Sequence, residues 1–167
     1  IVHTDDDAHY LKTDFYGETN WAVSFGAIFL SAENAADFSD ANNIVYGHHM
    51  NDGSMFSPIA DFEDPDTFNA CRTVYIFTPS GNYRLITFSL VHCAAYDPLA
   101  QTVFASEQER AAYVQDKVDR SVVSVEGLPS AADMNHTFTL ATCDNSAQNG
   151  RWVLFAYVAE QTAGAAG

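Results

Sequence analysis

Residues 136–142 (HTFTLAT) and 152–158 (WVLFAYV) decide the fold, because both stretches are rich in β-branched and aromatic residues and predict strands. Between them lie Cys143 and a polar loop that contains Asn149 and Gly150. Two strands separated by so short a loop are expected to pair as an antiparallel hairpin. Such a hairpin places Cys143, where the first strand ends, beside Arg151, where the second strand begins.

The same β-forming composition recurs along the chain. Further strands are predicted at 22–30, 44–46, 73–78 and 83–91, the last two joined as a hairpin. Apolar residues at helical spacing predict a helix over 54–62 that ends at 64–66. Ser106 opens a capping box with Glu109 and predicts a second helix over 107–119. Short strands joined by turns favour a mainly-β fold, a closed or nearly closed barrel with a few peripheral helices.

The chain is expected to divide into a polar lead-in (residues 1–20), one folded domain (21–160) and a tail (161–167). No apolar run approaches the roughly 20 residues that cross a bilayer. Because the chain begins at Ile1 without an initiator Met, we interpret it as a trimmed piece of a longer precursor.

Charge restricts the partners. The formal net charge is −15, from 22 acidic and 7 basic side chains, and a polyanion of this kind disfavours binding to nucleic acid or anionic lipid. A content of 47% hydrophobic residues is that of a folded globule. The acidic residues between 61 and 66 are typical of a solvated face rather than of a Ca²⁺ site, so no metal is expected there.

The three cysteines differ in their surroundings. Cys71 and Cys93 lie in apolar, strand-like sequence, where we expect small buried residues, with a disulfide between them as the alternative. An odd count leaves at least one thiol free. At a strand end beside Arg151, Cys143 is accessible, and a guanidinium can favour a thiolate and donate to an oxyanion. The alternative is a rim cysteine near a surface arginine by chance.

A cysteine nucleophile needs an imidazole partner, which can come from anywhere in the sequence. His48 follows a predicted strand and Gly47, whose flexibility permits an unusual turn, so it is a candidate. A structural histidine is the alternative interpretation. Adjacent residues of an extended chain point to opposite sides, so only one of His48 and His49 is expected to face the thiol.

Several motifs together resemble the sortases of Gram-positive bacteria, and class B in particular. They are NIVYGHHM (43–50), GSMF (53–56), TLATC (139–143) with the downstream Arg151, the helix expected within 106–120, and GAIFL (26–30). The resemblance covers residues 10–158. It implies a sortase-type closed β-barrel of about eight strands with a helix before the cysteine strand.

The resemblance implies a nucleophile, an acid/base group and an oxyanion stabiliser, which are Cys143, His48 and Arg151. His49 matches a position where the family accepts other residues and is secondary. Thr142 is expected to help shape the site, and the backbone N–H of Asp144 is expected to be a second oxyanion donor.

The implied activity is that of a cysteine transpeptidase. Such an enzyme cleaves a C-terminal sorting motif of secreted proteins and joins the acyl group to an amine of a peptidoglycan precursor or to a pilin lysine, without metal or cofactor. The implied location is the outer face of the cytoplasmic membrane or the cell wall of a Gram-positive bacterium, with an anchored precursor. The alternatives are a purely hydrolytic cysteine peptidase, a non-catalytic surface-binding module, and a metal site built from His48, His49 and Cys143.

Overall fold

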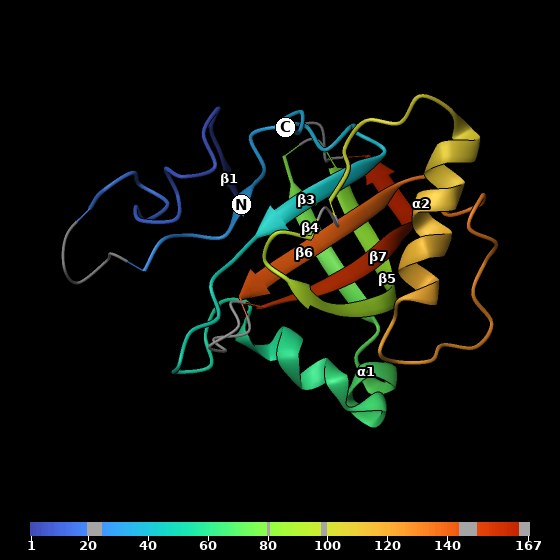
Figure 1. The fold of residues 1–167 in the computed structure, drawn as a ribbon. Helices are drawn as coiled ribbons and strands as arrows, with labels where there is room; N and C mark the ends of the chain where they lie inside the picture. Colours follow the sequence, from blue (N-terminus) through green and yellow to red (C-terminus); the bar gives the residue numbers. More distant parts are fainter. Residues whose placement is uncertain (20–24, 80, 98–99, 144–149, 164–167) are drawn as a thin grey trace.

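The computed structural model describes residues 1–19, 25–79, 81–97, 100–143 and 150–163, with only the backbone described at Cys143 and Ala163 (Figure 1). The elements in chain order are β1 (Val2–His3), β2 (Phe29–Leu30), β3 (Asn42–Tyr46), the 3-10 helix η1 (Ser57–Glu63), α1 (Pro65–Ala70), β4 (Thr73–Thr78), β5 (Gly81–Ala94), α2 (Glu107–Asp119), β6 (Thr137–Cys143) and β7 (Gly150–Ala163). A mainly-β fold with a few peripheral helices is therefore confirmed.

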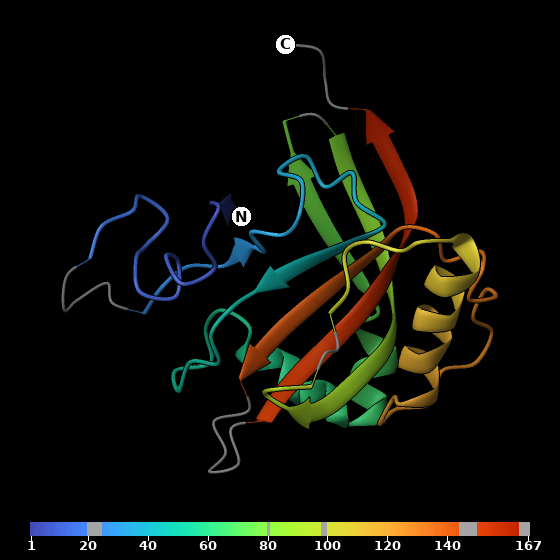
Figure 2. The ribbon, with the colours of Figure 1, turned by 45° about the horizontal axis from the view of Figure 1, so that its top comes forward.

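The strands of the described residues form one hydrogen-bonded sheet in the order β1-β2-β3-β6-β7-β5-β4. The pairs β1/β2 and β3/β6 are parallel, and the other neighbouring pairs are antiparallel. A closed barrel of about eight strands was expected. The described part of the chain instead forms a curled sheet of seven strands, with β1 and β4 as its outermost strands. Figure 2 shows β5 and β7 as long curved strands, and β5 carries register shifts at Arg84/Leu85 and Thr87/Ser89. Such bulges bend a strand and increase its twist.

Two hairpins that the sequence predicts are present. β4 pairs with β5 from Thr73↔Ile86 to Thr78↔Gly81. β6 pairs with β7 in antiparallel register up to Cys143↔Arg151. β7 continues to Ala163, five residues beyond the predicted strand end at Val158, because it keeps pairing with the first residues of β5.

The sheet buries both faces. Along β6 and β7, Leu140 and Leu154 belong to one apolar cluster, which also includes residues of η1 and α1. Ala141 and Phe155 belong to a second cluster, together with Val114 of α2. This alternation follows from the two-residue period of a strand. The helices therefore cover opposite faces, and α2 lies on the face that carries Ala141.

Helix α2 lies where the capping box predicts it. The Ser106 hydroxyl accepts a hydrogen bond from the Glu109 backbone N–H at 3.1 Å, and the Glu109 carboxylate accepts one from the Ala105 N–H at 2.6 Å. The first contact satisfies a backbone donor that a helix start leaves without an intrahelical partner, and the second ties the residue before the N-cap to the first turn. The predicted bounds are confirmed at both ends.

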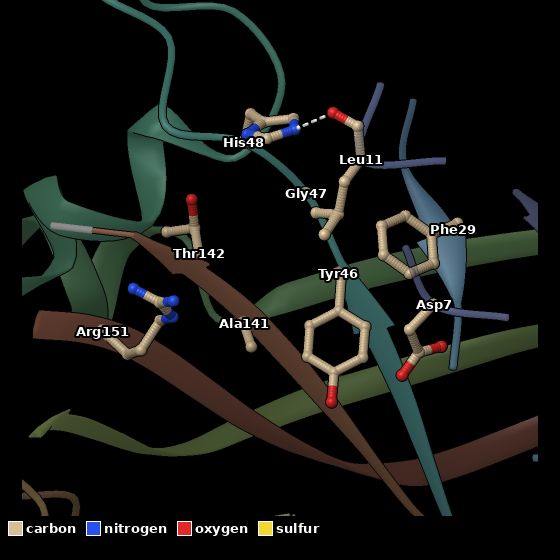
Figure 3. Close-up of a pocket in the computed structure, with 9 residues that line it drawn as sticks. All are labelled: Asp7, Leu11, Phe29, Tyr46, Gly47, His48, Ala141, Thr142 and Arg151. Atoms are coloured by element: carbon tan, nitrogen blue, oxygen red, sulfur yellow. Dashed lines mark hydrogen bonds between the residues drawn. The ribbon is translucent and has the colours of Figure 1, made fainter. Parts of the chain in front are cut away.

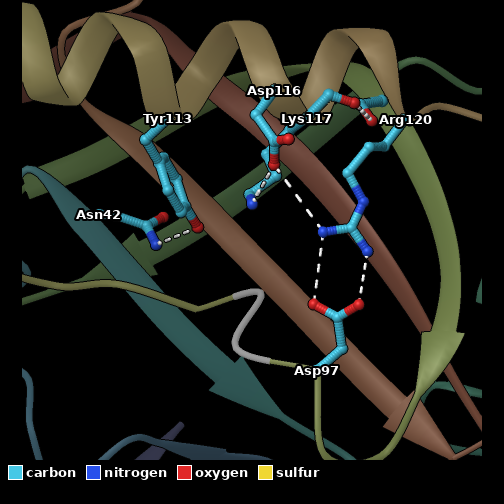
Figure 4. Close-up of polar contacts among 7 residues, drawn as sticks. Asn42, Asp97, Tyr113, Asp116, Lys117 and Arg120 are labelled. Carbon is cyan, nitrogen blue, oxygen red and sulfur yellow. Dashed lines mark hydrogen bonds and ion pairs between the residues drawn. The ribbon is translucent and has the colours of Figure 1, made fainter.

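Polar contacts connect α2 to the loop that follows β5 (Figure 4). Arg120 donates to both oxygens of the Asp97 carboxylate, at 3.3 and 2.7 Å. Lys117 is only 4% exposed, pairs with Asp116 at 2.7 Å and lies 4.4 Å from the centre of the Tyr113 ring. A buried charge is tolerated only when it is paired in this way. The Lys117 contacts lie within α2, whereas the Arg120–Asp97 pair joins the end of the helix to the loop after β5.

Two predicted elements are shorter or of another type. Of the strand predicted over 22–30, only β2 forms among the described residues, because Gly26 has φ +71° and interrupts the extended backbone. The helix predicted over 54–62 is the 3-10 helix η1, and the unpredicted helix α1 follows it. A new helix begins there because the Asp64 side chain accepts a hydrogen bond from the Thr67 N–H at 2.9 Å and caps α1.

The prediction of small buried cysteines at positions 71 and 93 is wrong for Cys71. Cys71 is exposed and lies at the C-cap of α1, because β4 begins only at Thr73. Cys93 lies in β5 and is half-buried. Both thiols are free, so the alternative of a disulfide between them is also excluded.

Candidate active site

Three segments that are distant in sequence meet at one edge of the sheet. β3 and β6 run parallel with Tyr46 opposite Ala141, and the Gly47 N–H extends the pairing by donating to the Ala141 carbonyl at 3.1 Å. Parallel strands end at the same edge of a sheet. His48 follows Tyr46 by two residues and Cys143 follows Ala141 by two, so this edge brings the histidine segment beside the cysteine segment.

The β6–β7 hairpin adds the arginine to the same edge. Its register places Cys143 directly opposite Arg151, as the sequence predicts. On its other side Arg151 lies opposite Cys93 of β5, so the arginine sits between two cysteine positions on a row across three strands. The sequence analysis missed this second neighbour because pairing of β5 with β7 is not local. Asp144, the expected second oxyanion donor, lies outside the described residues.

A pocket of about 180 Å³ opens at this edge (Figure 3). His48, Thr142 and Arg151 line it from the three strand segments, and Asp7 and Leu11 line it from the N-terminal segment. The structure thus brings together Thr142, His48 and Arg151, which the sequence assigns to one site. The sequence analysis did not identify the N-terminal residues, because it interpreted residues 1–20 as a lead-in.

His48 and His49 have different environments. His48 is half-buried, lines the pocket, and its Nε2 lies 3.1 Å from the Leu11 carbonyl oxygen. His49 forms an antiparallel bridge with Met55, and it is not among the described residues that line the pocket. Of the two histidines, His48 is thus the one that lines the pocket.

Gly47 is required for space rather than for an unusual backbone turn. A Cβ at this position would lie 2.6 Å from the Phe56 ring, closer than real Cβ contacts allow. The φ of Gly47 is not in the left-handed region. The ring of Phe56 therefore packs directly against the Gly47 backbone. This contact fixes the path of the chain from the end of β3 into His48.

Arg151 and Thr142 differ in how they are held. Arg151 is half-buried, and its Nη1 donates to the Gly150 carbonyl at 3.0 Å. Thr142 is 2% exposed, and its hydroxyl has no hydrogen-bond partner within the described ranges. A buried hydroxyl without a partner is costly, and this one belongs to a residue of the pocket wall.

The electrostatics distinguish the second cysteine of the row. Burial, and next the negative charge of Asp97, raise the pKa of Cys93 to about 11. Cys93 therefore stays a protonated thiol at neutral pH and is a poor nucleophile. Burial also raises the pKa of Tyr46 in the pocket, and the carboxylate of Asp7 adds to this shift.

No group of three or more metal-ligating side chains occurs within the part of the chain whose side chains the structure describes. The described helices include none that is long and apolar enough to span a membrane.

Comparisons with known proteins point to one family, although no family model matches the chain. Sortase B of Listeria monocytogenes is 30% identical over 156 residues, which cover 92% of this chain and 61% of that protein. Sortase B of Staphylococcus aureus is 26% identical over 137 residues, which cover 82% of this chain and 54% of that protein. The chain thus spans less than two thirds of the length of these relatives.

Solved structures agree. A C232S mutant of Clostridium perfringens sortase B matches with a TM-score of 0.87 and 27% identity, over 95% of this chain and 74% of that one. An S. aureus sortase B–substrate complex matches with a TM-score of 0.83 over 95% of this chain and 72% of that one. Its identity of 24% makes it a likeness of fold. Taken together, these sequence and structure matches support a class B sortase.

Proposed function

We propose that the chain is a cysteine transpeptidase in which Cys143 is the nucleophile, His48 the acid/base group and Arg151 the oxyanion stabiliser. The observation that carries this proposal is the register of the sheet edge. β3/β6 pairing brings His48 beside the end of β6, and β6/β7 pairing places Arg151 opposite Cys143. A nucleophile, its base and an oxyanion donor in mutual reach are the parts that acyl transfer requires.

In the first step the Cys143 thiolate attacks the carbonyl carbon of a peptide bond in the substrate. Negative charge develops on the carbonyl oxygen, where the planar guanidinium of Arg151 donates hydrogen bonds. The C–N bond then breaks, and the His48 imidazolium gives its proton to the leaving amine. The product is a thioester between Cys143 and the acyl part of the substrate, with the amine part released.

In the second step an amine attacks the thioester carbonyl. His48 takes the proton of the attacking amine, the carbon–sulfur bond breaks and the Cys143 thiolate is restored. The result is a new amide bond, and splitting the exchange into two steps lowers each barrier. Arg151 serves both steps, because the same oxygen carries the charge in each tetrahedral intermediate.

The acyl donor that we propose is a C-terminal sorting motif of a secreted protein, and the acceptor is an amine of a peptidoglycan precursor or a pilin lysine. The proposed location is the cell envelope of a Gram-positive bacterium, with the native precursor anchored in the membrane. Support comes from the similarity to class B sortases and from the S. aureus sortase B, which has been solved as a substrate complex. The pocket beside His48 and Arg151 offers a place for a peptide.

The test is incubation of the protein with a panel of sorting-motif peptides, with and without an added amine, followed by mass analysis. We expect a thioester adduct on Cys143 and, with amine, a transpeptidation product. A Cys143→Ala variant should give neither. Product unaffected by the amine would identify a hydrolytic peptidase instead. No adduct with any peptide would leave a non-catalytic binding module.

A further inference from the structure

The imidazole of His48 contacts a backbone carbonyl from the N-terminal segment. Its Nε2 lies 3.1 Å from the Leu11 oxygen, and Figure 3 shows this contact among the residues that line the pocket. A carbonyl oxygen has no hydrogen and can only accept. The contact therefore requires a proton on Nε2 of His48, in the neutral ring as well as in the imidazolium.

The Leu11 carbonyl is held in place by the segment that leads into β2. The Ala27 N–H donates to the Tyr10 carbonyl at 2.9 Å, one peptide before Leu11. Closer to the N-terminus, the Asp7 carboxylate accepts from the Ala32 N–H at 2.6 Å. On the other side of Leu11, the Lys12 N–H donates to the His9 carbonyl at 3.2 Å. Contacts before and after Leu11 thus hold the chain here, so its carbonyl is a preorganised acceptor.

Gly26 makes room for this arrangement. Its φ is +71°, a conformation that favours glycine. A Cβ at this position would lie 2.6 Å from the Tyr10 oxygen, 2.9 Å from the Leu11 oxygen and 2.9 Å from Nε2 of His48. Real Cβ atoms do not come so close, so any other residue at position 26 must push the carbonyl and the imidazole apart.

We propose that Leu11 and Gly26 are positioning residues of the active site: the Leu11 carbonyl holds His48 protonated on Nε2, and Nδ1 is the nitrogen that exchanges the proton. The proposal rests on the proposed transpeptidase function. In the first step Nδ1–H gives its proton to the leaving amine, and in the second step Nδ1 takes a proton from the attacking amine. The Nε2–H bond to Leu11 stays intact through both steps. The N-terminal segment is then part of the catalytic centre.

The first test reads the tautomer directly in the whole protein. Histidine labelled with ¹⁵N is observed by NMR at alkaline pH, and the signals of His48 are identified by their loss in His48→Asn. If the Leu11 carbonyl keeps the His48 ring in one tautomer, the spectrum should show separate shifts of a protonated Nε2 and an unprotonated Nδ1. Averaged shifts, or a proton on Nδ1, would overturn the proposal. This measurement needs no activity, so it stands apart from the test of the proposed function.

The second test is Gly26→Ala, with Gly127→Ala as the matched control. Gly127 has φ +70°, nearly the same backbone conformation, but an added Cβ there meets no heavy atom within 4 Å. Displacing a catalytic group by about 1 Å costs roughly 10²-fold in rate. We expect Gly26→Ala to lose about that factor in kcat with KM changed less than about twofold, and to show averaged His48 shifts.

The control separates the outcomes. Gly127→Ala should keep wild-type kcat and the held tautomer. Wild-type kcat in folded Gly26→Ala would overturn the positioning role. If Gly26→Ala does not fold, the tautomer of the wild-type protein decides. A wild-type protein that forms no thioester with any peptide would refute the proposed function, while the NMR result would still decide the Leu11 contact.

Discussion

Replacing Arg151 separates an oxyanion role from a structural role. Arg151 lies directly opposite Cys143, and opposed Cα atoms of an antiparallel pair are about 4.5–5.5 Å apart. A guanidinium at that position reaches the oxygen of an adduct on the cysteine. Loss of one such donor costs about 10²–10³ in kcat, or about 2.7–4 kcal/mol. We expect this loss in Arg151→Ala, and loss of most turnover in Arg151→Lys, because an ammonium lacks the planar fork.

The structural role predicts a much smaller effect. Nη1 of Arg151 donates to the Gly150 carbonyl at 3.0 Å. A hydrogen bond of this kind contributes about 0.5–1.5 kcal/mol to stability, and 1 kcal/mol lowers Tm by about 2–4 °C in a domain of this size. Loss of this hydrogen bond alone is therefore expected to lower Tm by only a few degrees, and turnover is compared per folded molecule.

The assay is the initial rate of peptide transfer, divided by the folded fraction from circular dichroism. Arg84→Lys is the matched control, because Arg84 makes an exposed ion pair with Glu160 at 3.1 Å, and exposed pairs contribute about 0–1 kcal/mol. It should retain wild-type turnover. Near wild-type turnover in Arg151→Lys would refute the oxyanion role and leave Cys143 and His48 as the catalytic pair. A lowered Tm with normal turnover per folded molecule would mean that Arg151 only anchors the hairpin.

Two further predictions concern the other groups of the site. In a Cys71→Ser background, needed because Cys71 is exposed, a thiol probe at neutral pH should label Cys143 well before Cys93. Burial raises the pKa of Cys93 to about 11, so the labelling of Cys93 should rise only as the pH approaches that value. Faster labelling of Cys93 than of Cys143 in folded protein would contradict the assignment of the nucleophile. His48→Ala should abolish acyl transfer without unfolding the protein, whereas His49→Ala should keep substantial activity. The reverse pattern in the same assay would assign the acid/base role to His49.

Local signals in the sequence were sufficient for several elements. The capping box of Ser106 and Glu109 predicted the start of α2, because a helix start depends on hydrogen bonds between residues three apart. The hairpins were predictable for the same reason, since their strands are joined by short loops. The pairing of Cys143 with Arg151 followed from the second hairpin alone. The choice of His48 over His49 came instead from the family resemblance.

Tertiary structure decided where the histidine lies relative to the cysteine. The parallel pairing of β3 with β6 joins segments about a hundred residues apart, and no local pattern specifies which distant strands become neighbours. The same holds for Cys93 beside Arg151, and for the Leu11 carbonyl on the His48 ring. The sequence by itself determined the residue types and the short-range elements. Only burial of both sheet faces in one fold decided the order of the strands, and with it which side chains share the active-site edge.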